Sequence, residues 1–164
     1  MIVVSDTSPV TNLAAIGRLD LLQKLYEKVI IPQAVYRELA HVSDGMQGTT
    51  PLQIPEWIEC QAVVDRAVVT ALQMEVDEGE AEAIALAMEL KADFLLLDER
   101  HGRAIASRFG LRFIGLLGVV IEAKHRGYIP AVKPIVDDLM VRAGFWVSQQ
   151  LYARVLQITG EYPK

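Results

Sequence analysis

The chain has 164 residues, with 16 basic and 21 acidic side chains, a formal net charge of −5 and a pI near 5.2. This length is enough for one domain with a proper hydrophobic core, and a 52% hydrophobic content excludes a disordered chain. The acidic balance argues against a protein that holds nucleic acid by net charge alone, but it leaves open one that gathers its acids into a metal site.

The single cysteine, Cys60, can form neither an intramolecular disulfide nor a thiolate-rich zinc site, which predicts a cytoplasmic protein. No uninterrupted apolar run approaches the ~20 residues of a membrane span. Residues 1–4 lack the basic residues that begin a signal peptide. We therefore expect neither a membrane anchor nor a secretion signal.

Short apolar runs alternate with longer helical patterns, which predicts a mainly parallel sheet covered by helices. Residues 2–5 are a β-branched run too short for a helix and form the first expected strand. Ser8 and Pro9 have the residue types of a helix cap and a first helical position. Gly17 is expected to separate two helices.

The next segment predicts a second strand at residues 29–31 and a helix from Pro32 through about Leu39. Residues 43–51 are rich in turn-forming residues and predict a loop. Residues 54–64 are expected to be extended, with Pro55 excluded from a central strand.

The second half repeats this alternation. Residues 94–97 form a continuous apolar run, typical of a strand buried on both faces, and the run stops at Asp98. The last residues predict two helices without a strand of their own, an appended helical hairpin. The other elements expected here are helices at 65–74, 80–90, 103–109, 116–126, 130–144 and 148–158 and a strand at 111–114.

Two aspartates, Asp6 and Asp98, follow directly after buried strands, and sites in an open parallel sheet are built at the carboxyl ends of the strands. Glu38 and Glu80 could reach the same edge from helices. Four carboxylates in one crevice would repel one another unless a divalent cation neutralised them. Hard oxygen ligands suit Mg²⁺ or Mn²⁺, and a pair of such ions about 4 Å apart can activate water and stabilise the leaving oxygen in phosphodiester cleavage.

Four motifs in order along the chain resemble those of PIN-domain ribonucleases, with the prokaryotic VapC-like PIN proteins as the nearest subgroup. They are Val-Ser-Asp-Thr-Ser-Pro at 4–9, the segment 32–39, Gly-Glu-Ala-Glu-Ala-Ile-Ala-Leu-Ala at 79–87 and Leu-Leu-Leu-Asp-Glu-Arg at 95–100. The resemblance implies a three-layer α/β/α, Rossmann-like domain over residues 1–127. Residues 128–164 would then be a helical extension packed on the same domain.

The resemblance also implies an Mg²⁺- or Mn²⁺-dependent endoribonuclease site. The first acid of the family falls on Asp6, with Thr7 and Ser8 as hydroxyl neighbours that could support the metal. The helix-borne acid falls on Glu38, and the acid at a strand end falls on Asp98.

The third acid falls on Glu80, where the commoner pattern has aspartate, and Glu82 competes for this role. Because residues i and i+2 point to different sides of a helix, we expect only one of them to be a direct ligand. Glu80 also fits a capping box with Asp77.

Arg100 and Arg103 could contact RNA phosphate, and so could Arg108, although arginines at this spacing also suit a solvated helix face. Glu99 and Arg100 are expected to be exposed turn residues. His101 is kept only as a candidate for substrate contact.

The resemblance further implies the toxin of a type II toxin–antitoxin pair, with an antitoxin partner and a homodimer. A catalytically inactive PIN-fold binding module, in which Asp6 caps a helix and Asp98 makes a turn, is the alternative. A phosphoacceptor receiver domain ranks last, because no acid pair follows the first strand and no lysine ends a late one.

Overall fold

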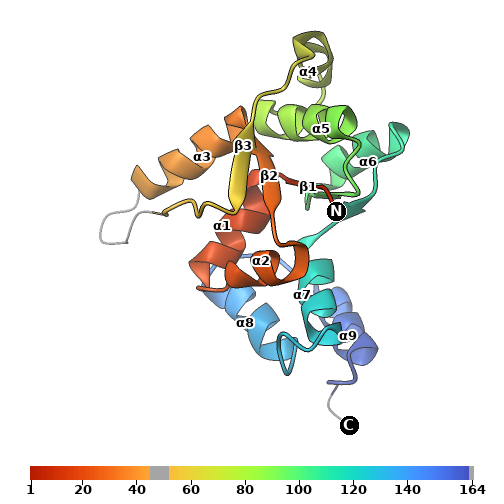
Figure 1. The fold of residues 1–164 in the computed structure, drawn as a ribbon. Coiled ribbons are helices and arrows are strands. Elements are labelled where there is room, and N and C mark those ends of the chain that lie inside the picture. Colours follow the sequence, from red (N-terminus) through yellow and green to blue (C-terminus); the bar gives the residue numbers. More distant parts are fainter. Residues whose placement is uncertain (45–51, 163–164) are drawn as a thin grey trace.

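The computed structural model describes residues 1–44 and 52–162, and within them a five-stranded parallel sheet is covered by helices on both faces (Figure 1). The strand order is β3-β2-β1-β4-β5. This confirms the three-layer α/β/α fold. The strands are β1 (Val3–Ser5), β2 (Val29–Pro32), β3 (Ile58–Gln61), β4 (Phe94–Leu96) and β5 (Phe113–Ile114).

Successive residues of a strand point to opposite faces of a sheet, so Val3 and Val4 of β1 enter different hydrophobic cores. Val3 packs in the core formed with α1 (Thr7–Ala15), α2 (Asp20–Tyr26) and α7 (Leu116–His125). Val4 packs in the core formed with α4 (Arg66–Leu72), α5 (Glu78–Leu90) and α6 (Arg100–Arg108). Both faces of the sheet are therefore buried at β1, β2 and β4, which explains the unbroken apolar runs of these strands.

Helix α3 (Gln33–Asp44) follows β2 without a loop and packs against α5 and α1. Pro32 is the last residue of β2 rather than the start of the helix, and the helix runs beyond Leu39. Of the expected loop, residues 43 and 44 belong to α3 and residues 45–51 lie outside the described residues.

The beginning of α1 also differs from the expectation. The helix begins at Thr7, with Asp6 rather than Ser8 at the N-cap position. Similarly, α6 begins at Arg100, three residues earlier than predicted. Helix α1 starts one residue after β1 ends, whereas Leu97, Asp98 and Glu99 separate β4 from α6.

Strand β1 lies at the point where the strand order reverses. The chain passes from β1 outward to β2 and β3 and then returns to β4, on the other side of β1. The crevice outside the carboxyl ends of two such strands is the usual place for a site in an open parallel sheet.

The C-terminal helices α8 (Lys133–Val141) and α9 (Gln149–Ile158) lie beside α1 and α7 (Figure 1). They bury Val136, Leu139 and Val155 in the same core as Val3. The division at residue 127 stays a prediction. Among the described residues, no helix is both long and apolar enough to cross a membrane.

Candidate functional site

An open cleft of about 440 Å³ lies at the carboxyl ends of β1 and β4. Among the described residues, five carboxylates and three hydroxyls line it. They are Asp6, Thr7, Ser8, Thr11, Glu38, Asp77, Glu80 and Glu99. Three of the four acids singled out in the sequence, Asp6, Glu38 and Glu80, therefore face one cleft.

Asp6 is the buried centre of this cleft, with 6% of its surface exposed. Its backbone N–H donates to Leu96 O at 3.0 Å, which ties the end of β1 to β4. Although Asp6 stands at the N-cap position of α1, its side chain makes no capping hydrogen bond. Burial raises the pKa of Asp6 to about 7; the Thr7 backbone N–H opposes this rise, and the charges of Glu80, Asp77 and Glu38 add to it.

Glu38 reaches the cleft from α3, where its carboxylate accepts a hydrogen bond from the Thr7 hydroxyl at 2.6 Å. A Cβ at position 79 would collide with Glu38 Oε1. Only glycine at position 79 therefore allows the first turn of α5 to approach Glu38 this closely. Thr7 fixes the Glu38 carboxylate, and Gly79 makes room for it.

Glu80 lies in the first turn of α5, where its backbone N–H donates to Asp77 Oδ1 at 2.8 Å. Burial raises the pKa of the Glu80 side chain, and the negative charges of Asp77 and Glu99 raise it further. The Asp77 backbone N–H and the nearby His101 lower this pKa in part. Glu80 thus takes part in capping α5 and also faces the cleft, so the two roles considered for it are compatible.

Glu82, the alternative to Glu80 as the third acid of the predicted site, does not line the cleft. It is 2% exposed, and its carboxylate accepts from the Ala34 N–H at 2.9 Å and from Arg66 Nη1 at 2.9 Å. These bonds join α5 to α3 and α4. Glu82 therefore holds helices together, away from the position of Glu80.

Asp98 faces a neighbouring cavity rather than the cleft. Its Oδ1 accepts the Leu116 backbone N–H at 2.9 Å and lies 3.8 Å from Arg103 Nη2. Its Oδ2 is buried without a hydrogen-bond partner. Burial raises the pKa of Asp98, whereas the Leu116 N–H and Arg103 lower it.

Glu99 is the acid that lines the cleft at the end of β4. Sequence reasoning treated it as an exposed turn residue, and it is indeed exposed, at the extended N-cap of α6. Neighbouring residues of an extended backbone point to opposite sides, so Asp98 and Glu99 face different cavities. In the sequence, the signal for a role of Glu99 was that two adjacent acids, Asp98 and Glu99, follow a buried strand.

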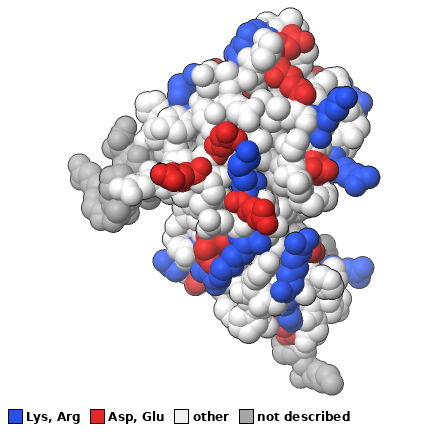
Figure 2. Space-filling view, in the orientation of Figure 1, with Lys and Arg blue, Asp and Glu red and all other residues white. Residues whose placement is uncertain are grey.

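Two of the three arginines predicted to contact phosphate, Arg103 and Arg100, differ in their surroundings. Arg103 is held within the protein, since its Nε donates to Leu97 O at 2.8 Å and its guanidinium lies 5.1 Å from the centre of the Phe113 ring. Arg100 is exposed at the first residue of α6. Acidic and basic side chains are interspersed over the face drawn in Figure 2.

A family model described as a PIN domain matches residues 2–161. The chain belongs to the PIN-domain family. The match includes α8 and α9 as well as the sheet. PIN domains are generally nucleases and usually use divalent metals, so this PIN domain has a nuclease-type fold. No curated protein matches the chain.

The donor set of the cleft suits a hard divalent cation, because carboxylate and hydroxyl oxygens are the ligands of Mg²⁺ and Mn²⁺. Within residues 1–44 and 52–162, no three acidic, histidine or cysteine side chains stand close enough to hold one ion as they are. A cation would therefore have to draw the cleft carboxylates inward.

Proposed function

We propose that this PIN domain is an Mg²⁺- or Mn²⁺-dependent endoribonuclease that hydrolyses RNA phosphodiester bonds at the five-carboxylate cleft. The observation that carries the proposal is the cleft itself, where Asp6, 6% exposed, lies with four other carboxylates, and its burial raises its pKa to about 7. Such an arrangement destabilises the anionic form of Asp6, and a divalent cation would remove that penalty.

In this proposal Asp6, Glu38 and Glu80 hold the cation. The fourth ligand predicted from the sequence is Asp98, but Glu99 lines the cleft itself. We therefore assign the fourth role to Glu99, and to Asp98 the role of anchoring the first turn of α7.

The remaining cleft residues orient these groups and the substrate. Thr7 keeps the Glu38 carboxylate turned into the cleft through their 2.6 Å hydrogen bond. The hydroxyls of Ser8 and Thr11 face the same space and can donate to phosphate oxygens. A bound Mg²⁺ or Mn²⁺ would supply polarisation of the phosphate and a lowered pKa of water. We assign to Arg100, which is exposed at the start of α6, a contact with the RNA backbone outside the cleft.

By its resemblance to VapC-like proteins, we place this activity in the cytoplasm, as the toxin of a type II toxin–antitoxin pair that forms a homodimer and binds an antitoxin. Apolar side chains exposed on α8 and α9 suit a protein partner. These side chains are Val141 and Ile158.

The test is cleavage of a mixed-sequence RNA with Mn²⁺ and with EDTA, by the native protein and by Asp6→Asn and Glu80→Gln. Each variant should lose cleavage by at least about a hundredfold, the scale of losing a group that acts in the transition state. Glu75→Gln is the matched control, because Glu75 is an exposed acid paired with Arg108 outside the cleft. Unchanged cleavage in both cleft variants would overturn the proposal.

The second candidate is a catalytically inactive PIN-fold module, favoured by the absence of a ready-made three-acid group in the described part of the chain. Calorimetric titration with Mn²⁺ distinguishes the two. Binding that is lost in Asp6→Asn supports the nuclease, whereas an absence of binding in the native protein supports the inactive module.

A further inference from the structure

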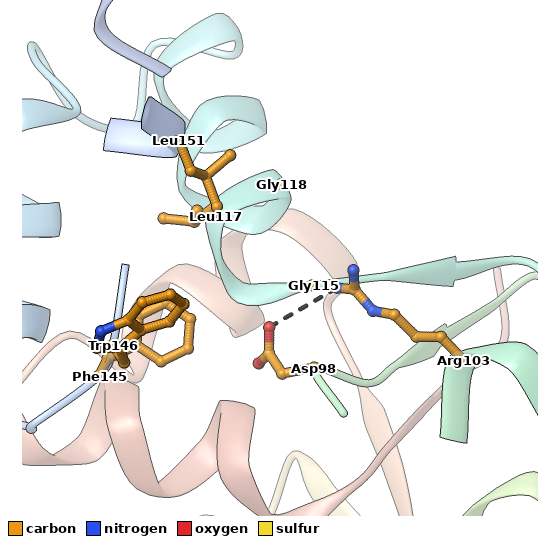
Figure 3. Close-up of a pocket in the computed structure, with 8 residues that line it drawn as sticks. All are labelled: Asp98, Arg103, Gly115, Leu117, Gly118, Phe145, Trp146 and Leu151. Carbon is orange, nitrogen blue, oxygen red and sulfur yellow. Dashed lines mark ion pairs between the residues drawn. The ribbon is translucent and has the colours of Figure 1, made fainter. Parts of the chain in front are cut away.

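A second cavity, of about 420 Å³, is lined by Asp98, the residue before Glu99 of the acidic cleft. Asp98 and Arg103 lie on one side of this cavity, Phe145 and Trp146 on another, and Leu117 and Leu151 on a third (Figure 3). The cavity thus lies between the end of the sheet and the segment that joins α8 to α9. Its volume is within the roughly 300–1,000 Å³ range of small-molecule sites.

The polar wall offers one acceptor and several donors. Asp98 Oδ1 is already bonded to the Leu116 N–H, whereas Oδ2 is buried with no donor. A buried carboxylate oxygen without a partner costs free energy, which a ligand that supplies an N–H would recover. Arg103 uses its Nε on Leu97 O, so its terminal N–H groups remain next to Asp98.

Gly115 keeps these two side chains together. A Cβ at this position would collide with Arg103 Nη2 and come within 2.9 Å of Asp98 Oδ1. The polar wall therefore depends on a glycine at the N-cap of α7.

The apolar wall offers flat aromatic surface. Trp146 is 82% exposed, although it lines the cavity beside the half-buried Phe145. An exposed indole at the mouth of a cavity is suited to stack on a nucleobase, whatever the base.

We propose that this cavity binds one unstacked nucleobase of the RNA, next to the bond cut in the cleft, and that it prefers cytosine to uracil. The cytosine amino group would donate to Asp98 Oδ2, and its ring nitrogen and carbonyl oxygen would accept from Arg103. Uracil presents a carbonyl oxygen where cytosine has the amino group, and this oxygen would face the carboxylate. This inference rests on the proposed function, because that proposal identifies the bound polymer as RNA.

The experiment titrates the ¹⁵N-labelled full-length protein with cytidine and with uridine in EDTA and follows the two tryptophan indole N–H signals. Cytidine should shift the Trp146 signal and bind at least several-fold more tightly than uridine. Trp57 is the internal control, because it precedes β3 at the opposite edge of the sheet and its signal should not move.

Two variants test the two walls. In Asp98→Asn, the Leu116 N–H should hold the amide oxygen at the Oδ1 position and leave the NH₂ at the Oδ2 position. This variant should reverse the preference in favour of uridine. Trp146→Ala should weaken the binding of both nucleosides about tenfold, as measured from the NMR signals of the ligands. Phe109→Ala, which removes an exposed aromatic ring elsewhere, should leave both affinities unchanged.

Equal affinity for cytidine and uridine in the native protein would overturn the proposal, as would an unchanged preference in a folded Asp98→Asn variant. A Trp146 shift with N-acetyl-arginine amide and none with cytidine would also overturn it, in favour of a protein partner. The titration needs neither metal nor cleavage. RNA cleavage without nucleoside selectivity would therefore contradict this inference alone, and selectivity without cleavage would contradict the proposed function alone.

Discussion

Asp6 destabilises the metal-free fold at neutral pH and is also central to the proposed site. Its carboxyl is 6% exposed and faces other carboxylates, and burial raises its pKa from 3.8 to about 7. The folded protein therefore binds this proton more tightly than the unfolded chain does. The contribution of Asp6 to the free energy of unfolding therefore falls as the pH rises from about 4 to about 7, and its cost stays in full above that range.

Asp6→Asn should stabilise the metal-free protein at pH 8 because the amide carries no charge to desolvate. We expect a gain of roughly 1–3 kcal/mol at pH 8, below the limit set by 1.36 kcal/mol per pKa unit, and almost none at pH 4. Urea unfolding in EDTA at the two pH values measures this difference. An equal change at both pH values would contradict it.

Gly79→Ala should weaken Mn²⁺ binding without unfolding the protein. Alanine has the higher helix propensity, by about 1 kcal/mol, but its Cβ would displace the Glu38 carboxylate. We expect a loss of about tenfold in Mn²⁺ affinity by calorimetry. Gly102→Ala is the control, because its Cβ would meet only the Leu97 side chain, at 3.3 Å. Equal affinities in the two variants would show that Glu38 is not a ligand.

At the scale of elements, the first turns of α5 place two glutamates in different environments. Residues two apart are about 200° apart around a helix. Glu80 consequently faces the cleft while Glu82 enters the space between α3 and α4. One helix therefore supplies a candidate ligand and also fixes the helix that carries Glu38.

Glu82→Ala should reduce the stability of the fold and leave metal binding unchanged. The substitution leaves the Ala34 N–H without its acceptor and removes the ion pair with Arg66, which is itself half exposed. We expect a loss of roughly 2 kcal/mol, the cost of one unpaired buried group, measured by urea unfolding. Glu80→Gln, by contrast, should lose metal binding without loss of stability. A stable Glu82→Ala variant that fails to bind Mn²⁺ would contradict this division.

At the scale of the molecule, the helices after residue 127 complete a core that the sheet alone leaves open. Their buried side chains pack with those of α1, α2 and α7. Each large aliphatic side chain buried contributes about 1.5–3 kcal/mol. A few of them therefore match the whole stability of a domain, about 5–15 kcal/mol.

A chain ending at Gly127 should consequently fail to unfold cooperatively, as measured by circular dichroism during urea titration. The shortened chain would lose Val136, Leu139 and Val155 from this core. A cooperative transition in the shortened chain would show instead that residues 1–127 fold alone.

The amino-acid sequence by itself determined the alternation of strands and helices, and hence the parallel three-layer fold, because burial on both faces leaves unbroken apolar runs. The sequence also singled out Asp6 as a candidate site residue, because it is a charged residue directly after such an apolar run. Glu38 and Glu80 came from ordered motifs rather than from periodicity.

Only the tertiary structure decided which of two neighbouring acids faces the cleft. Glu80 and Glu82 are close in sequence, as are Asp98 and Glu99, and residue type does not separate them. The direction of each side chain depends on where its helix or strand end is held by partners far along the chain, such as Ala34 for Glu82 and Leu116 for Asp98. These partners lie far away in the sequence. Only the assembled fold therefore decides which acid faces which cavity.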